Sequence, residues 1–469
     1  MTSASPLTPA VSLRPGEHVS GFSVLKVTPL SSLGCCVVEA VHDVTRAKCL
    51  HVVADDDENL FAIAFRTPPP DNTGVPHILE HSVLNGSRRF PVKDPFVEML
   101  KMSMATFLNA MTYPDKTVYP VASNVRQDFF NLVDVYCDAV LNPRITPLTL
   151  KQEGCRFAFE DPARMDSPLV LKGVVYNEMK GAYSDVDSLV DRIAEQVLFP
   201  DTPYGFDSGG DPDAIPGLTY NRFRDFYRRL YHPANARIVL YGNIATQEHF
   251  AFLDERLREC PPPPADLDSG IPLQTRWAAP GEHRERYPVD PDENTTGKAA
   301  VTLNWLVGTV DEPAADLAME VVDRLLLGSD AAPLHKALID SQLGKDLTHS
   351  GYANSILETT FHVGMKGTDA ARKDDIVNLV FEVLGKVADE GFDDERVRIA
   401  FNQMQYSHRE IQAHYPLRLM QWIYNTWLYD RDPLVYLRTG EYLDEVGTPY
   451  KQDPELCQKL VRERLRDIP

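Results

Sequence analysis

The feature that most constrains this chain is a five-residue stretch, His77-Ile78-Leu79-Glu80-His81. On a helix, His77 and His81 stand one turn apart on the same face, which is the spacing at which two imidazoles bind one zinc ion. Glu80 lies beside His81 and one turn from His77, so its carboxylate can reach a water on the same metal. The order H-x-x-E-H is the inverse of the H-E-x-x-H zinc motif. The stretch therefore predicts a zinc site.

Two histidines on an amphipathic helix also occur as a polar surface pair or as a hydrogen-bonded buried pair, so the flanking sequence has to decide. A proline-rich loop precedes the stretch, Asn72 or Thr73 can cap the helix, Pro76 suits its first turn and Gly86 suits its end. The buried stripe would come from four apolar residues, Ile78, Leu79, Val83 and Leu84. A helix that is buried on one side and carries His-Glu-His is the pattern of a site.

The chain is acidic, with 68 Asp and Glu against 47 Lys and Arg and a formal net charge of −21. This balance argues against a nucleic-acid partner or an anionic membrane surface and is compatible with cationic peptides, although solubility alone also explains it. No apolar run approaches the roughly 18 residues of a membrane span, so no membrane partner is expected. A length of 469 residues gives room for two or three domains.

Seven cysteines are scattered along the chain without a C-x-x-C pair, and several lie in apolar surroundings. They predict reduced thiols in a reducing compartment. Residues 1–24 have no apolar signal core, and their composition is too weak for a transit peptide. We therefore expect a cytoplasmic protein, with an organelle matrix as the alternative.

Apolar periodicity predicts two series of strands and helices. In the first series we expect strands at 22–27, 35–41, 60–65, 105–112, 117–121, 155–160 and 237–241. Besides the histidine helix and a short helix from residue 94, we expect helices at 124–141, 173–183, 186–199, 219–231 and 246–257. Asn124 with Gln127 resembles a capping pair. The second series has strands at 299–307 and 359–365 and helices at 314–327, 369–389 and 394–412, followed by an aromatic segment, 415–429, that suits packing or an interface.

The second series repeats the order of the first, which indicates a duplicated architecture. The tetrapeptides at 84–87 and 326–329 both close a helix that follows a buried strand. Matching them places Met319, Val322 and Asp323 where the histidine helix has His77, Glu80 and His81. The second unit would then keep the fold and lose the metal site.

Proline-rich and polar sequence between the two series predicts a linker. We predict a catalytic zinc-binding domain over residues 1–262, this linker over 263–292 and a second domain over 293–430. Residues 431–469 would begin a helical connector.

Several motifs taken together resemble the pitrilysin-type (inverzincin, M16) peptidases and, within them, the presequence-protease subfamily. The matching segments are the metal helix with its continuation to 87, Asp94-Pro95-Phe96, TFLNA at 106–110, TVYP at 117–120, GVVYNEMKG at 173–181, YHPANA at 231–236 and YGN at 241–243. The likeness covers roughly residues 20–430. It implies an α+β fold of two homologous domains, each a mostly antiparallel sheet packed against helices. It also implies that this chain is the N-terminal half of a double-length clamshell, closed by a C-terminal half or a second subunit.

The resemblance also assigns the third zinc ligand, which spacing cannot choose from 68 carboxylates. It implies Glu178, which on its own would be read as a solvated helix residue next to Lys180. Glu153 is a candidate for a supporting carboxylate. Zinc held by two imidazoles and one carboxylate keeps a fourth position for water. Glu80 would then be the general base that takes a proton from the zinc-bound water.

Four residues of the segment 107–110 are candidates for substrate binding. Asn109 and Ala110, if they lie on an exposed strand edge, could hold a peptide backbone by strand addition. Phe107 and Leu108 could wall a hydrophobic pocket. A structural role for Asn109 and core packing for Phe107 and Leu108 are open alternatives.

These observations predict a zinc metalloendopeptidase, or its catalytic half, that binds one Zn²⁺ and cleaves short unstructured peptides. The resemblance implies that an Arg/Tyr pair from the C-terminal half supports the substrate and the tetrahedral intermediate. Whether this half is active alone therefore stays open. The alternative is a weak or inactive scaffold subunit of the same fold, whose mark would be a damaged His-Glu-His set. A purely structural zinc site usually has four protein ligands, including Cys, and no open position. No Cys lies near His77 in the sequence. The sequence has no G-x-S-x-G motif and no phosphate-binding glycine loop.

Overall fold

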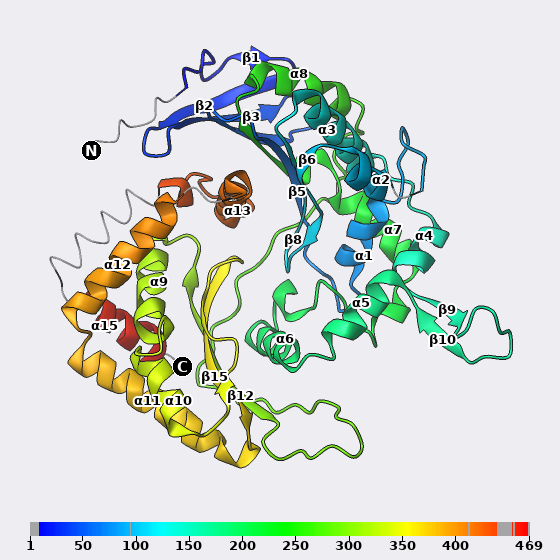
Figure 1. Cartoon of the computed structure of the whole chain (residues 1–469). Helices are drawn as coiled ribbons and strands as arrows, with labels where there is room; N and C mark the ends of the chain where they lie inside the picture. The colour runs from blue at the N-terminus through cyan, green and yellow to red at the C-terminus, as the bar shows by residue number, and fades with distance from the viewer. Residues whose placement is uncertain (1–8, 94, 411–412, 439–452, 454, 468–469) are drawn as a thin grey trace. The chain divides into compact units, whose positions relative to one another are not determined.

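The computed structural model describes residues 9–93, 95–410, 413–438, 453 and 455–467 (Figure 1). The chain divides into two compact units, the first from residues 1–183, 206–271 and 413–421 and the second from 184–205, 272–412 and 422–469. Each unit has its own sheet and its own hydrophobic core. The domain boundaries predicted from the sequence stay a prediction.

The sheet of the first unit is antiparallel except for one pair of strands. Its order is β1-β2-β3-β4-β11-β5-β8-β6, with β7 also paired to β8, and only β11 and β4 run parallel. The strands are β1 (His18–Val19), β2 (Phe22–Leu30), β3 (Cys35–His42), β4 (Lys48–Val53), β5 (Asn59–Arg66), β6 (Ala105–Leu108), β7 (Met111–Thr112), β8 (Lys116–Ser123) and β11 (Ala236–Gly242). The predicted mostly antiparallel α+β fold is confirmed. Strand β4 was not predicted, because its side chains are buried on both faces and show no alternation.

Helices cover one face of this sheet (Figure 1). They are α1 (Val75–Val83), α2 (Pro95–Met102), α3 (Arg126–Leu141), α4 (Pro147–Glu153), α5 (Val174–Ala182), α7 (Tyr220–Leu230) and α8 (Thr246–Leu257). Phe61, Ile63 and Phe65 of β5 share a core with Ile78 and Leu79 of α1. A separate hairpin, β9 (Arg156–Phe159) with β10 (Leu169–Lys172), leads into α5. The histidine helix is thus fixed against the middle of the sheet.

The start of α1 differs from the prediction. Gly74 is the N-cap, with φ of +65° and no side-chain cap, so the predicted capping by Asn72 or Thr73 is wrong. Pro76 does lie in the first turn, as predicted. A Cβ atom on Gly74 would lie 2.6 Å from the carbonyl oxygen of Gly209, so glycine is required by both conformation and space. The predicted Asn124–Gln127 cap of α3 is also wrong, because Val125 is its N-cap and no side chain caps it.

The second unit has a smaller, fully antiparallel sheet of order β12-β15-β13, with β14 also paired to β15. Its strands are β12 (Ala299–Thr309), β13 (Asp346–Leu347), β14 (Gly351–Ala353) and β15 (Glu358–Thr368). Its helices are α6 (Val186–Leu198), α9 (Pro313–Leu327), α10 (Pro333–Ser341), α11 (Lys373–Glu390), α12 (Asp394–Arg409) and α15 (Leu456–Val461). Helix α10 was not predicted, and the predicted end of α12 at 412 lies outside the described residues.

One further helix and several short ones complete the described residues. Helix α13 (Tyr415–Trp427) carries the aromatic segment and contributes to both units. In the second unit its Trp427 is buried, which agrees with a packing role. The short helices are η1 (Pro203–Gly205), η2 (Ile215–Gly217), η3 (Pro233–Asn235), η4 (Ala370–Arg372), η5 (Tyr436–Arg438) and η6 (Arg462–Arg466). No helix in the described part of the chain is long and apolar enough to cross a membrane.

The duplicated order of elements is visible in the two units. Helix α1 follows β5 through a loop, and α9 follows β12 in the same way. Met319 and Val322 of α9 are buried in the core of the second unit. Among the described residues, the only group of three side chains able to hold a metal lies in the first unit. The residue-by-residue match of Asp323 with His81 stays a prediction.

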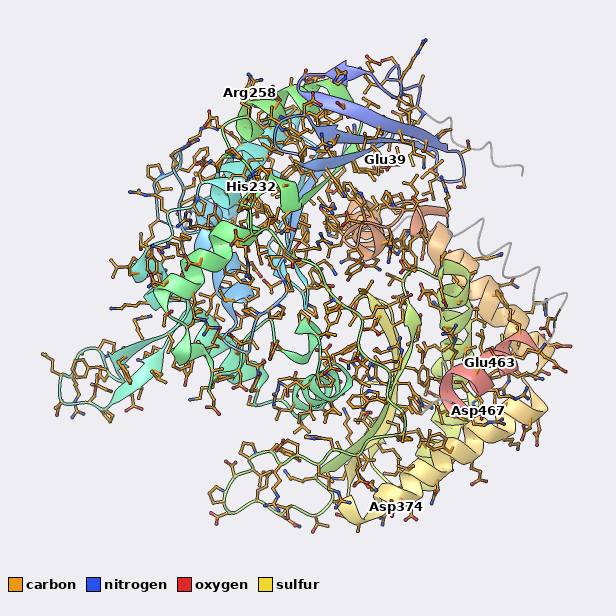
Figure 2. The ribbon with its side chains drawn as sticks, turned by 180° about the vertical axis from the view of Figure 1, so that it is seen from behind. Glu39, His232, Arg258, Asp374, Glu463 and Asp467 are labelled. Carbon is orange, nitrogen blue, oxygen red and sulfur yellow. The ribbon has the colours of Figure 1, made fainter. Side chains whose placement is uncertain are left out.

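The expected linker is irregular, but parts of it are buried. In the first unit, His232 donates from Nε2 to the Pro261 carbonyl at 2.8 Å, and Ser269 donates to Asn235 at 2.7 Å (Figure 2 labels His232). In the second unit, the backbone N–H of Gln274 donates to Glu358 at 2.7 Å. The segment is therefore attached to the unit on each side of it instead of running free.

A buried carboxyl group organises the core of the second unit. Asp316 of α9 accepts hydrogen bonds from the hydroxyls of Tyr352 and Tyr436 and from the amide of Asn354. Burial, with a smaller contribution from Glu320, raises the pKa of Asp316 to about 6. The native carboxyl therefore binds its proton more tightly than the same group does in an unfolded chain, where the pKa is about 4.

Asp316→Asn should remove part of the pH dependence of stability. The contribution of Asp316 is fully present below pH 4 and is lost as pH rises to about 6, on the order of 3 kcal/mol in all. Urea unfolding from pH 4 to pH 8 should show the wild type losing stability relative to the variant over this window. Asp374→Asn, at an exposed acid labelled in Figure 2, should show no such trend. A pH-independent difference between wild type and Asp316→Asn would contradict this account.

Candidate metal centre

Helix α1 presents both histidines toward the same point. The rings of His77 and His81 lie 4.9 Å apart between centroids and are nearly perpendicular, at 76°. The opposite side of α1 is held by the core, with Ile78, Leu79 and Val83 fully buried. The side chains of His77 and His81 are 10% and 25% exposed, so the pair lies at the edge of the core and not on the open surface. The 3.6-residue repeat thus produced the juxtaposition expected from the sequence.

Glu178 comes from α5 and meets the two imidazoles. Its Oε2 lies 3.7 Å from Nε2 of His77 and 3.8 Å from Nε2 of His81. Helix α5 starts at Gly173, where a Cβ atom would lie 1.8 Å from the carbonyl oxygen of Gly154. Gly154 ends α4. This close backbone approach brings α5 against the end of α4, which carries Glu153.

The three side chains fit a zinc ion. One nitrogen of each histidine and one oxygen of Glu178 all lie within 4.8 Å of one another. Ligand atoms bound to one tetrahedral zinc are separated by about 3.4 Å, given metal–ligand distances near 2.1 Å. The observed separations to Glu178 are only slightly longer. Two imidazoles and a carboxylate are also the donor set that leaves zinc an open position.

The outer nitrogen of each ring has an acceptor. Nδ1 of His77 lies 3.2 Å from the carbonyl oxygen of Gly209, and a carbonyl can only accept, so this nitrogen carries the proton. Nδ1 of His81 lies 3.4 Å from Oε2 of Glu153. With the proton on Nδ1, the lone pair is on Nε2, which is the atom that faces Glu178 in both rings. Both rings are therefore oriented for metal binding.

Glu153 is a buried carboxylate that is held by several donors. Its Oε1 accepts from Asn85 at 2.6 Å and from Gln152 at 2.8 Å. Burial raises its pKa, but the hydrogen bonds from His81, Asn85 and Gln152 outweigh burial, and the net pKa is lowered. Burial lowers the pKa of His81, and Glu153 and the other nearby carboxylates outweigh it, so the net pKa of His81 is raised. The hydrogen bonds that the fold supplies to Glu153 thus favour its ionised form.

Glu80 lies next to the metal group without belonging to it. Its side chain is buried, with 8% of the residue exposed. Its negative charge acts on a set of tyrosines around α1: burial, with a smaller effect of Glu80, raises the pKa of Tyr113, Tyr119 and Tyr136. A buried carboxylate one residue from a proposed ligand and outside the three-residue group agrees with the predicted general base, and that role stays a prediction.

The four substrate-binding candidates lie on or next to β6, at the edge of the sheet. Asn109 is exposed, but its backbone N–H donates to the Pro120 carbonyl at 3.3 Å and its carbonyl accepts from Tyr136 at 3.1 Å. Leu108 and Ala110 pack against the core of the first unit. Phe107 stacks edge-on with His414 at 5.8 Å. Strand β6 is at the edge of the sheet, but both backbone groups of Asn109 are already paired within the chain, and the roles of the four residues stay predictions.

Sequence reasoning missed three groups that hold the site. The Gly209 carbonyl is a backbone atom, and no residue type marks it. Asn85 and Gln152 donate to Glu153 from positions that no periodicity selects. The only available signal was the stretch Asp207-Ser208-Gly209-Gly210, since Asp followed by glycines is typical of a tight loop.

Two family models match the chain: Insulinase (Peptidase family M16) over residues 66–180 and Peptidase M16 inactive domain over residues 217–404. The chain belongs to the M16 peptidase family. The first match contains the histidine helix, Glu153 and Glu178. M16 peptidases are in general zinc-dependent, and this chain has the His-His-Glu group that such an ion would need.

The relatives indicate which M16 branch the chain resembles. Presequence protease 1 (chloroplastic/mitochondrial) of Arabidopsis thaliana is 40% identical over 455 residues, which cover 95% of this chain and 42% of the relative. Protein HypA of Clostridium perfringens is 41% identical over 433 residues, which cover 91% of this chain and 44% of the relative. The chain spans about half the length of the curated relatives it matches, and it resembles the N-terminal half of a presequence protease.

A solved structure supports the fold. The peptidase M16 inactive domain from Pseudomonas fluorescens superimposes with a TM-score of 0.66 at 16% identity, covering 89% of this chain and 92% of that one. At this identity the likeness concerns the M16 fold alone.

Glu153→Gln should weaken zinc binding about 10- to 100-fold, because the buried negative charge that orients His81 is lost. Zinc affinity of metal-free protein can be measured by competition with a chromophoric chelator. The control is Glu160→Gln, which changes an exposed glutamate beyond the end of β9 and should leave the affinity unchanged. An unchanged affinity in Glu153→Gln would remove Glu153 from its supporting role.

Proposed function

We propose that this M16 chain is the zinc-binding half of an endopeptidase that cleaves short unstructured peptides. The observation that carries the proposal is the convergence of Nε2 of His77, Nε2 of His81 and a carboxylate oxygen of Glu178, with both Nδ1 atoms hydrogen-bonded elsewhere. Three ligand atoms arranged in this way could bind a single ion. The buried Glu80, one residue from a ligand and outside the set, supports hydrolysis over a structural metal.

The proposed chemistry assigns one task to each group. Zinc, when bound, supplies Lewis acidity that lowers the pKa of a nearby water and polarises a peptide carbonyl. His77, His81 and Glu178 would hold the ion. Glu80 would accept the proton of the attacking water at its carboxylate and return it to the leaving amine. Glu153 would keep His81 in the required tautomer and orientation.

The proposed substrates are extended, flexible peptides. Strand β6 is the edge of the sheet, and we propose that a peptide pairs along β6 itself, because the backbone N–H and C=O of Asn109 are already hydrogen-bonded within the chain. The net charge of −21 favours cationic peptides over acidic ones.

Because the chain spans about half of its curated relatives, we further propose that a C-terminal half or a second subunit completes a closed chamber. Seven free cysteines support a reducing location, the cytoplasm or an organelle matrix.

The competing proposal is a scaffold subunit without activity. The M16 fold is shared by the structure titled an inactive domain, so the fold cannot separate the two. The side chains favour the enzyme, since all three proposed ligands and Glu80 are present in the first unit.

Glu80→Gln should strongly reduce peptide cleavage while zinc stays bound. Loss of the general base should lower the cleavage rate about 10²- to 10⁴-fold. The readouts are cleavage of a fluorogenic peptide and zinc content by elemental analysis. Glu98→Gln, at an exposed glutamate on α2, is the matched control. Glu178→Gln should lose the metal itself.

Full turnover in Glu80→Gln would exclude it as the base. A wild-type chain that binds zinc but cleaves nothing, alone or with its C-terminal half, would favour the scaffold.

A further inference from the structure

The loop between α6 and α7 contacts both helices that carry the proposed metal ligands. Its residue Gly209 accepts from Nδ1 of His77 on α1. A Cβ atom on Gly209 would lie 2.8 Å from Cε of Met179, which follows Glu178 on α5. A Cβ atom on Gly74, at the start of α1, would lie 2.6 Å from the Gly209 carbonyl oxygen. The two glycines thus fill a narrow space between the ligand-bearing helices.

One carboxylate in this loop binds in two directions. Oδ1 of Asp207 accepts the backbone N–H of Gly209 at 2.8 Å and that of Gly210 at 3.3 Å. Oδ2 of Asp207 accepts the hydroxyl of Tyr183 at 2.8 Å. Tyr183 is the C-cap of α5, five residues beyond Glu178. Asp207 therefore connects the loop that holds His77 to the helix that holds Glu178.

The hydrogen bond from the Gly210 N–H to Asp207 fixes the orientation of the peptide unit between Gly209 and Gly210. In a trans peptide, the N–H and the C=O point in opposite directions. Asp207 holds the Gly210 N–H on one side, so the Gly209 carbonyl is directed to the other side, toward Nδ1 of His77. A charged acceptor on the N–H also polarises the carbonyl and makes it a stronger acceptor.

The loop itself is anchored independently of the metal ligands. The backbone N–H of Asp207 donates to the side chain of Asn72 at 2.8 Å, and that of Asp211 donates to the Asn72 carbonyl at 2.8 Å. The carboxylate of Asp211 accepts the backbone N–H of Asp213 at 2.8 Å, a contact within the loop itself. Asp207 and Asp211 thus belong to the same loop, but the Asp207 side chain bonds to Tyr183 of α5 while the Asp211 side chain bonds within the loop.

We propose that Asp207 is a positioning residue of the metal centre, which rests on the proposed zinc peptidase function. Through Gly209 it fixes the tautomer and direction of His77. Through Tyr183 it fixes the distance of α5, and hence of Glu178, from α1. Without it, His77 could carry its proton on Nε2, the atom that must be free for the ion.

The test measures the zinc affinity of the metal-free 469-residue chain by chelator competition, and the absorption spectrum of the Co²⁺-substituted protein. Asp207→Ala should weaken zinc binding about 10- to 100-fold and alter the Co²⁺ spectrum. Asp207→Asn retains an acceptor for the two backbone N–H groups and should restore most of the affinity. Tyr183→Phe removes the hydrogen bond between α5 and Asp207 but leaves the contacts of Asp207 with Gly209 and Gly210, so it should give a smaller loss. Asp211→Ala is the matched control and should lower stability without changing zinc affinity.

The outcomes separate this inference from the proposed function. Zinc binding and cleavage in the wild type, with unchanged affinity in Asp207→Ala, would overturn the positioning role alone. Equal losses in Asp207→Ala and Asp211→Ala would also overturn it, since the effect would then be general loop damage. A wild type that binds no zinc would overturn both. If Asp207→Ala does not fold, Asp207→Asn and Tyr183→Phe decide by the affinity order given above.

Discussion

The site depends on where two imidazole protons are placed. A histidine binds a metal through a nitrogen lone pair, so the proton of a neutral ring has to be on the other nitrogen. In this chain both outer nitrogens have acceptors, the Gly209 carbonyl for His77 and Glu153 for His81. These acceptors come from residues 132 and 72 positions away from the histidines they serve. The helix supplies the spacing of the two rings, and the tertiary fold supplies their protonation and direction.

Close backbone packing makes these long-range contacts possible. Gly74 meets Gly209 at the start of α1, and Gly173 meets Gly154 at the start of α5. In each case a side chain would occupy the space in which a second backbone segment now lies. Because interiors are closely packed, a larger residue at either place would shift a ligand-bearing helix. The glycines thus set the distances among His77, His81 and Glu178 without contacting an ion.

The sequence predicted the local parts of this arrangement well and the distant parts poorly. The face shared by His77 and His81, with Glu80 beside them, follows from helical periodicity alone. Glu178 could be named only through the family resemblance, because nothing in its neighbourhood distinguishes it from other helix glutamates. The Gly209 carbonyl could not be predicted at all, since every residue has a backbone carbonyl and no residue type marks the one that accepts from His77. The failed cap of α1 has a similar origin: a left-handed glycine starts the helix, and Asn72 instead bonds to the loop that holds Gly209.

The second unit repeats the order of elements without a three-residue metal group among its described residues. Helix α9 follows a strand as α1 does, and its Met319 and Val322 are buried in an apolar core. Helix α1 itself has Ile78, Leu79 and Val83 in the core, and its start is fixed by the Gly74–Gly209 packing. The groups that hold α1 in place are therefore distinct from the groups that would hold zinc. Of the three proposed ligands, Glu178 has a half-exposed side chain, 54% accessible, which places the open side of the centre toward solvent. A zinc ion held by two imidazoles and a carboxylate on the solvent side of the helix pair would keep a free position, which is what the proposed hydrolysis requires.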